Sequence, residues 1–199
     1  MIIRIEKDRF QLARSKGKER FIESRKDKRQ ANEYSGFDNY RNIIIRDIQG
    51  SIAEVAVADF LKIKDFTPTV NNFPYFCKKE NKWKKDPDIE PNIEVRSVQC
   101  HSSYPNKRKS LILREWEGIE KKTKSVIEGF FKRKFILAIT HYDEMEEQVK
   151  KGYIDVDIVG WVIGEDAMIP KYIMNPNENT RGAKPAYFVP IKELIPFTP

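Results

Sequence analysis

The residues best suited to chemistry are concentrated in residues 86–98, where Asp88, Glu94 and Arg96 lie around one short turn. Pro91 favours the turn because proline fixes φ, and the segment after it alternates as a β-strand does. The alternation places Glu94 and Arg96 on one face, and we expect Asp88, which precedes the turn, to lie near that face. Two such carboxylates repel each other unless a cation lies between them, and their hard oxygens suit Mg²⁺ or Mn²⁺. The alternative is a surface hairpin in which Glu94 and Arg96 form an ion pair of little energetic value.

These residues resemble the motif of the PD-(D/E)xK nuclease superfamily. Pro87 and Asp88 correspond to its Pro-Asp pair, and Glu94, Val95 and Arg96 correspond to its acidic-x-Lys triplet. The resemblance implies that Asp88 and Glu94 hold the metal and that the Val95 carbonyl is a backbone ligand. The departure is Arg96, because the family usually has Lys there and an arginine does not give up its proton. Arg96 would then neutralise charge in the transition state, and a metal-bound hydroxide or a second water would be the base.

A single charged residue interrupts the apolar helix that the sequence predicts over residues 43–61. Glu54 is the only charge between Ser51 and Ala58, and a buried carboxylate is costly unless it is paired or bound to a metal. One interpretation is that Glu54 reaches a Lys or Arg at the helix edge. The other is that it completes the metal site or holds a metal-bound water. The resemblance favours the second interpretation, since PD-(D/E)xK proteins typically carry a Glu on the helix before the Pro-Asp strand.

The N-terminal segment is strongly basic and has a helical composition. Residues 4–29 hold eleven Lys and Arg against five acids, which is almost the whole net charge of +7. The segment is either a basic arm that lies on phosphates or a solvated helix held down by a narrow apolar stripe. We expect Gly17, between two lysines, to break it in two. The candidate nucleic-acid contacts from this segment and from two later basic loops are Arg25, Lys26, Lys28, Arg29, Lys84, Lys85, Lys107, Arg108 and Lys109.

Length and composition limit the class of protein. A chain of 199 residues fits one domain, and its positive charge attracts polyanions such as nucleic acid. No apolar run approaches membrane-spanning length, and the first residues do not form a signal peptide. The two cysteines match neither a disulfide framework nor a metal-site spacing. We therefore expect a cytoplasmic protein with no membrane role, in the host cytoplasm if a phage encodes it.

The rest of the chain reads as alternating strands and helices. Strands are predicted at residues 75–77, 93–98, 111–114, 135–140, 153–163 and 187–189, a basic turn at 78–85, and helices at 115–134 and 165–174. Residues 159–167 and 185–190 are similar to the ends of small nuclease-like proteins from phages and prophages, which also tend to show Glu-Val-Arg in the central strand. This similarity covers residues 43–196. It implies a nuclease-like domain over 43–199, preceded by a basic helical extension and loop over 1–42.

Together these features predict an α/β fold with a restriction-endonuclease-like core. A mixed central sheet of about five strands would be flanked by helices, with the Glu54 helix on one face. The expected function is a Mg²⁺- or Mn²⁺-dependent nuclease that hydrolyses phosphodiester bonds in DNA; RNA is an open alternative, and a homodimer is compatible with it. A DNA-binding protein that has the nuclease fold but does not cut, and a structural or assembly protein without nucleic acid, also stay open.

Overall fold

The structure, a computed structural model, describes most of the chain. The described residues are 1–26, 40–70, 75–100, 110–113, 118, 125, 127–141, 147–148, 150–174 and 186–197. The chain divides into two compact units. The first contains Met1–Asn72, Ser97–Pro105 and Ala138–Ile158, and the second contains Phe73–Arg96, Asn106–Leu137 and Val159–Pro199.

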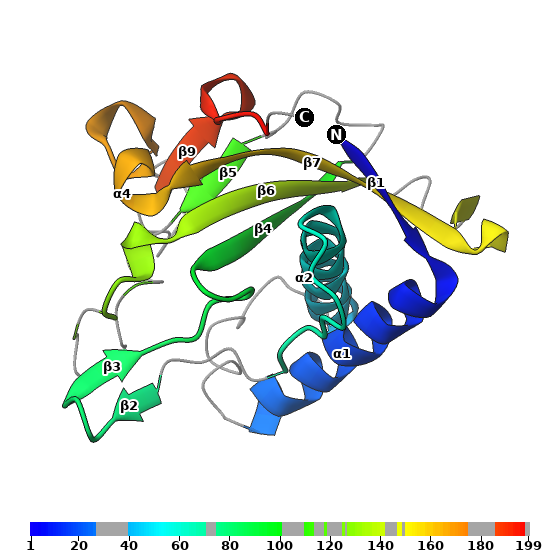
Figure 1. Ribbon diagram of the computed structural model, residues 1–199, viewed down its shortest axis with the longest axis horizontal. Coiled ribbons are helices and arrows are strands. Elements are labelled where there is room, and N and C mark those ends of the chain that lie inside the picture. The colour runs from blue at the N-terminus through cyan, green and yellow to red at the C-terminus, as the bar shows by residue number, and fades with distance from the viewer. Residues whose placement is uncertain are drawn as a thin grey trace. The chain divides into compact units, whose positions relative to one another are not determined.

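Two long helices, α1 (Lys7–Lys26) and α2 (Tyr40–Phe60), pack against each other in the first unit (Figure 1). The prediction of a buried core helix is confirmed for α2, because every side chain from residue 51 to residue 58 is buried. The apolar contribution of α1 is a narrow stripe formed by Phe10, Ala13 and Phe21, which the helical repeat brings to one face. Among the described residues, no helix combines the length and the apolar character needed to cross a membrane.

The predicted break at Gly17 is wrong, since α1 continues through it without interruption. A Cβ at Gly17 would lie 2.4 Å from the Cα of Ile48 and 2.9 Å from the carbonyl oxygen of Asp47 on α2. The absence of a side chain therefore lets the two helix backbones approach closely at this crossing. A glycine inside a helix costs about 1 kcal/mol relative to alanine, which the close packing of α1 on α2 offsets.

A four-stranded sheet has the order β1-β7-β6-β4, with β1 at Ile2–Glu6, β4 at Ile93–Cys100, β6 at Lys134–His141 and β7 at Tyr153–Ile163. β6 is buried without interruption from Phe135 to Thr140, which confirms a central strand covered on both faces. β7 alternates between buried and half-buried positions along its length. The chain is thus an α/β protein with a mixed sheet and flanking helices. Within the described residues this sheet has four strands, where about five were expected.

The first strand, β1, was not predicted, because five residues carry too little alternation to stand out. It pairs antiparallel with β7, with Ile5 opposite Ile154 and Arg4 opposite Asp155. The Arg4 side chain donates two hydrogen bonds to the Asp155 carboxylate, at 3.0 and 3.1 Å, and lies over the Tyr153 ring. Cross-strand partners of this kind stabilise an edge strand that its own sequence only weakly specifies.

The second unit contains shorter elements. A hairpin joins β2 (Tyr75–Cys77) to β3 (Lys82–Lys84), and β5 (Ser110–Leu113) and β8 (Ile173–Met174) flank β9 (Ala186–Pro190). The turn expected at 78–85 is therefore partly strand. The helix expected at 165–174 is also wrong: α4 (Gly164–Ala167) ends early and is followed by a 3₁₀ turn, Pro170–Tyr172, since proline lacks the amide hydrogen that a continuing helix needs.

The helix expected at 115–134 is only partly covered by the described residues. At the end of that range the chain forms a 3₁₀ turn, η2 (Phe130–Lys132), and then enters β6. A second 3₁₀ turn, η4 (Ile191–Glu193), follows β9.

Candidate functional site

A tight hairpin in the second unit sets the position of Asp88. Ile89 and Ile93 exchange backbone hydrogen bonds of 3.1 and 2.9 Å and close the turn between them. One residue earlier, the Asp88 carboxylate accepts a hydrogen bond of 2.8 Å from the backbone amide of Val95 on β4. Asp88 is buried. Its side chain is therefore directed across the hairpin onto the strand that carries Glu94.

Glu94 is completely buried and is held by two cations. Its Oε2 accepts a hydrogen bond of 3.1 Å from the Lys85 ammonium, and its Oε1 accepts one from the Arg133 guanidinium. Both cations are themselves largely buried, with side chains 12% and 10% exposed. Arg133 also donates to the backbone carbonyl of Lys85, so it links the segment after β3 to the carboxylate on β4. Charge-assisted hydrogen bonds of this type are the strong ones in proteins.

The electrostatics of Glu94 place Asp88 and Arg96 in the same cluster. Burial is the main cause that raises the pKa of Glu94 above its ordinary value, and repulsion from Asp88 adds to it. Lys85, Arg96 and Arg133 act in the opposite direction on the same pKa. The structure thus brings together Asp88, Glu94 and Arg96, which the sequence analysis had grouped, and adds two cations to them.

Two aromatic rings form an apolar wall beside the charges. Phe130 and Phe135 are fully buried and meet edge to face, with ring centroids 5.7 Å apart. The Lys85 ammonium lies 5.0 Å from the centre of the Phe130 ring, and the Arg96 guanidinium lies 5.1 Å from that of Phe135. Aromatic faces attract cations, and an apolar wall strengthens the electrostatic interactions next to it.

The backbone holds Arg133 in place from two sides. The amide of the next residue, Lys134, donates a 3.0 Å hydrogen bond to the carbonyl of Asn92 in the hairpin turn. The carbonyl of Arg133 accepts a 3.1 Å hydrogen bond from the amide of Gly164. Arg133 is therefore positioned by the start of β6, and its side chain reaches a carboxylate 39 residues earlier in the chain.

Sequence reasoning missed the role of both cations. Lys85 was assigned to nucleic-acid binding, and the one signal for a role at the carboxylates was its position just before Asp86, Pro87 and Asp88. Arg133 carried no signal, because it fell at the end of a predicted helix far from the motif. A long-range ion pair of this type has no local sequence pattern.

The cluster offers two carboxylates, Asp88 and Glu94, as candidate oxygen ligands for Mg²⁺, although both Glu94 oxygens already accept hydrogen bonds from cations. Mg²⁺ is commonly bound by one or two carboxylates, while waters and substrate phosphates complete its octahedral shell. Asp88 and Glu94 supply two carboxylates whose mutual repulsion a divalent cation would relieve. Within the described part of the chain, no group of three or more His, Cys, Asp or Glu side chains is arranged to hold a metal. Val95 uses its amide to hold Asp88, and a role for its carbonyl stays a prediction.

Glu54 belongs to the first unit and has a cationic partner there. The Arg20 guanidinium donates to Glu54 Oε1 at 2.8 Å and to Oε2 at 2.9 Å. Arg20 also donates to the backbone carbonyl of Thr69. This geometry corresponds to the interpretation in which Glu54 meets a Lys or Arg, while Asp88 and Glu94 lie in the second unit. The metal role of Glu54 stays a prediction.

The nucleic-acid contacts expected from sequence are only partly covered by the structure. Lys84 forms an ion pair of 2.6 Å with Glu80, and this hydrogen bond raises the pKa of Lys84. Arg25 and Lys26 belong to α1, but their side chains fall outside the described part. The remaining candidates lie outside the described residues altogether: Lys28, Arg29, Lys107, Arg108 and Lys109.

Comparisons of the chain with protein families, with curated proteins and with solved structures gave no match.

Proposed function

We propose that the chain is a Mg²⁺- or Mn²⁺-dependent nuclease that hydrolyses phosphodiester bonds in DNA, on a restriction-endonuclease-like core. The observation that carries this proposal is the side-by-side burial of Asp88 and Glu94 at one hairpin, with Lys85, Arg96 and Arg133 around them. The resemblance of residues 87–96 to the nuclease motif supports the same assignment.

The composition of the cluster supports a phosphate as its ligand. Two carboxylates face three cations, so the formal charge around Glu94 is positive before any metal binds. Burying several charges is costly, and clusters of this kind occur frequently at functional sites. A phosphodiester with its metal ion would add charges of both signs and fit the same cluster.

Each residue has a defined task in this proposal. Asp88 and Glu94 would hold the metal, which, when bound, lowers the pKa of its water and polarises the phosphate. Arg96 and Arg133 stabilise negative charge on the phosphate oxygens. Lys85 supplies an ammonium at the Glu94 carboxylate, which compensates for the arginine at position 96 where the motif usually has lysine.

A second candidate function is DNA binding without cleavage. It is favoured by the fact that both Glu94 oxygens already accept hydrogen bonds from cations. In that case the cluster is a structural ion-pair network that holds the hairpin to the start of β6. A nuclease acting on RNA and an assembly protein without nucleic acid are further outcomes that the same experiment separates.

Nicking of supercoiled DNA, with Mg²⁺, with Mn²⁺ and with EDTA, tests the proposal. Wild type should nick only with metal, and Asp88→Ala and Glu94→Ala should each lose activity while they keep the native circular dichroism spectrum. Glu165→Ala is the matched control, because Glu165 is an exposed carboxylate in the second unit; it should retain activity. Nicking in EDTA, or nicking by both site variants, would contradict the proposal.

Two further arms identify the alternatives. A salt-dependent gel shift without any nicking would indicate the DNA-binding protein, and neither nicking nor a gel shift would indicate the assembly protein. Cleavage of an RNA substrate but not of DNA would indicate a ribonuclease instead.

A further inference from the structure

The cations of α1 whose side chains the structure describes fall into two groups that differ in their partners. Arg9, Lys16 and Arg20 are paired with carboxylates: Arg9 with Asp59 at 2.6 Å, Lys16 with Glu19 at 2.7 Å, and Arg20 with Glu54 at 2.8 Å. Lys7, Arg14 and Lys18 are exposed and make no hydrogen bond or ion pair with any residue that the structure describes. Among these described side chains, Lys7, Arg14 and Lys18 are therefore the cations of α1 that are available to an external ligand.

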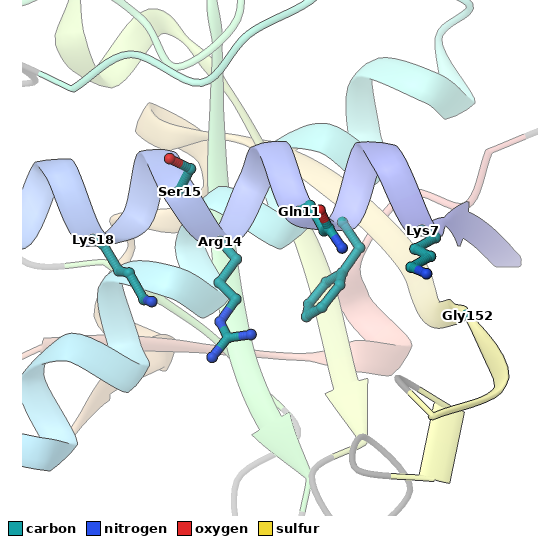
Figure 2. Close-up of a pocket in the computed structure, with 7 residues that line it drawn as sticks. Lys7, Gln11, Arg14, Ser15, Lys18 and Gly152 are labelled. Carbon is teal, nitrogen blue, oxygen red and sulfur yellow. The ribbon is translucent and has the colours of Figure 1, made fainter.

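The available cations form a row on one face of the helix. Positions 7, 14 and 18 are separated by seven and four residues, and this spacing brings side chains to the same side of an α-helix. Figure 2 shows Lys7, Arg14 and Lys18 pointing to one side of α1. They line a groove of about 410 Å³, together with Gln11 and Ser15.

Gly152, at the turn that leads into β7, lines the groove at its Lys7 end (Figure 2). Phe10, which is 8% exposed, also lines the groove. All of these residues belong to the first unit.

The length of the row suits a phosphate backbone. A helix rises about 1.5 Å per residue, so the Cα atoms of Lys7 and Lys18 lie about 16 Å apart along the axis. Each strand of a DNA duplex carries one phosphate about every 3.4 Å of the duplex axis, so a row of this length corresponds to about five phosphate steps measured along that axis. Gln11 and Ser15 add neutral hydrogen-bonding groups between the cations, as is usual in contacts to phosphate oxygens.

The groove is poorly suited to other acidic partners. A helix that lies in a membrane surface presents an apolar face to the lipid, but the apolar stripe of α1 is buried, at Phe10, Ala13 and Phe21. Protein interfaces are often anchored by aromatic residues that insert into pockets, and Phe10, the aromatic residue among the described residues that line this groove, is almost fully covered. The exposed lining is cationic or neutral and polar.

We propose that this groove along α1 is a docking surface for the sugar-phosphate backbone of nucleic acid, with Lys7, Arg14 and Lys18 as the phosphate contacts. It is distinct from the expected contacts at residues 25–29, which follow it along the chain. The docking surface would bind the same kind of nucleic acid that the proposed nuclease cuts, but the binding does not depend on cleavage.

Fluorescence anisotropy with a labelled DNA duplex in EDTA, from about 50 to about 200 mM salt, tests the docking surface. The variant is Lys7→Gln/Arg14→Gln/Lys18→Gln. The matched control is Lys64→Gln/Lys79→Gln/Lys192→Gln, because these lysines are exposed and likewise make no hydrogen bond or ion pair with a described residue. Both triple variants remove three positive charges, but only the first removes them from the groove.

In a plot of log affinity against log salt concentration, the slope for the groove variant should be smaller in magnitude by about 2.7. The variant loses three phosphate contacts, and each contact releases about 0.9 counterions. The control should change the slope by less than about 1, and Lys7→Arg/Arg14→Lys/Lys18→Arg should keep the wild-type slope. An equal change in both triple variants, or no change in the groove variant, would overturn the docking surface. Binding to phosphatidylserine vesicles should be measured in parallel. The docking surface would also be overturned if the groove variant lost binding to these vesicles but kept wild-type binding to DNA.

The design separates this proposal from the proposed function. Binding is measured in EDTA, where no metal-dependent cleavage occurs. A protein that fails to nick DNA but shows the expected difference in salt slope retains the docking surface and loses the nuclease assignment. A protein that nicks DNA with an unchanged salt slope retains the nuclease assignment and loses the docking surface.

Discussion

Arg20 of α1 holds both carboxylate oxygens of Glu54 of α2, with hydrogen bonds of 2.8 and 2.9 Å. Glu54 lies in a stretch of α2 that is otherwise buried and almost entirely apolar, and its side chain is only 3% exposed. A bidentate arginine is the partner that compensates such a carboxylate best. The pair therefore links the two helices at the buried Glu54 carboxylate.

Removing one partner of this pair should cost more than removing both. Arg20→Met should lower the free energy of unfolding by about 3 kcal/mol, because it leaves a buried carboxylate without its cation. Arg20→Met/Glu54→Gln should recover part of that loss. A double-mutant cycle in urea measures the coupling. Additive effects would show that the pair contributes nothing to stability, and a Glu54→Gln variant that is more stable than wild type would favour the metal role instead.

The close crossing at Gly17 predicts a large effect of one methyl group. Gly17→Ala should destabilise the protein by about 1–3 kcal/mol, because the new Cβ would meet the backbone of Ile48 and force the helices apart. Gly50→Ala is the matched control on α2, since its Cβ would meet only the end of the Arg20 side chain, at 3.5 Å. It should be neutral or stabilising by about 1 kcal/mol through helix propensity. Thermal unfolding of both variants checks this, and equal effects would contradict the packing role.

Asp47 predicts a specific dependence of stability on pH. Burial raises its pKa to about 6 from an ordinary value of 3.8, against the opposing effect of Arg20 and Arg46. Its Oδ2 has no hydrogen-bond partner among the described residues. Since the folded state holds the proton more tightly than the unfolded state, this group should lower stability as pH rises from about 4 to about 6.

Asp47→Asn should remove that decline. At pH 7 the variant should be more stable than wild type by about 1–2 kcal/mol, a value reduced from the full pKa difference because the side chain is partly exposed. Asp65→Asn is the control, since Asp65 is exposed and asparagine tolerates its positive φ of 54°. Urea unfolding at several pH values measures the effect. If the stability of Asp47→Asn still fell with rising pH as steeply as that of wild type, another group would be the cause of the decline.

The two cations on Glu94 should differ in what they do. Lys85→Met keeps an apolar chain beside Phe130 but removes the ammonium, so cleavage should fall about 10²-fold with little loss of Mn²⁺ affinity. Arg133→Met should destabilise the protein by about 3 kcal/mol, because Arg133 holds both the buried Glu94 carboxylate and the backbone carbonyl of Lys85.

Lys82→Met is the reference for both variants, since its ion pair with Glu128 is half exposed and pairs of this kind contribute little to stability. Nicking rates, calorimetry and urea unfolding distinguish these effects. Full activity of Lys85→Met would remove Lys85 from the site.

The parts of the fold that were predictable from sequence are those with a strong local pattern. The run of buried residues in α2, the continuous apolar β6 and the alternation of β7 each follow from periodicity alone. The hairpin was equally predictable, because a short turn and a period of two fix which side chains of β4 face Asp88. These patterns were sufficient to group Asp88, Glu94 and Arg96.

The parts that were missed depend on contacts between distant segments. Gly17 looked like a helix break, because its effect depends on α2, which the local sequence does not reveal. Arg133 and Arg20 look like ordinary surface cations, and only the folded chain brings them to Glu94 and Glu54. Strand β1 is specified largely by its partner β7. Local reasoning therefore located the carboxylates but not the cations that compensate them.

Isothermal titration calorimetry with Mn²⁺ tests most directly whether Asp88 and Glu94 form a divalent metal site. Wild type and the control Glu165→Gln should bind Mn²⁺ with the same affinity. Asp88→Asn/Glu94→Gln should lose that binding while it retains a cooperative unfolding transition. Unchanged Mn²⁺ affinity in the double variant, or no Mn²⁺ binding by the wild-type protein, would contradict the account.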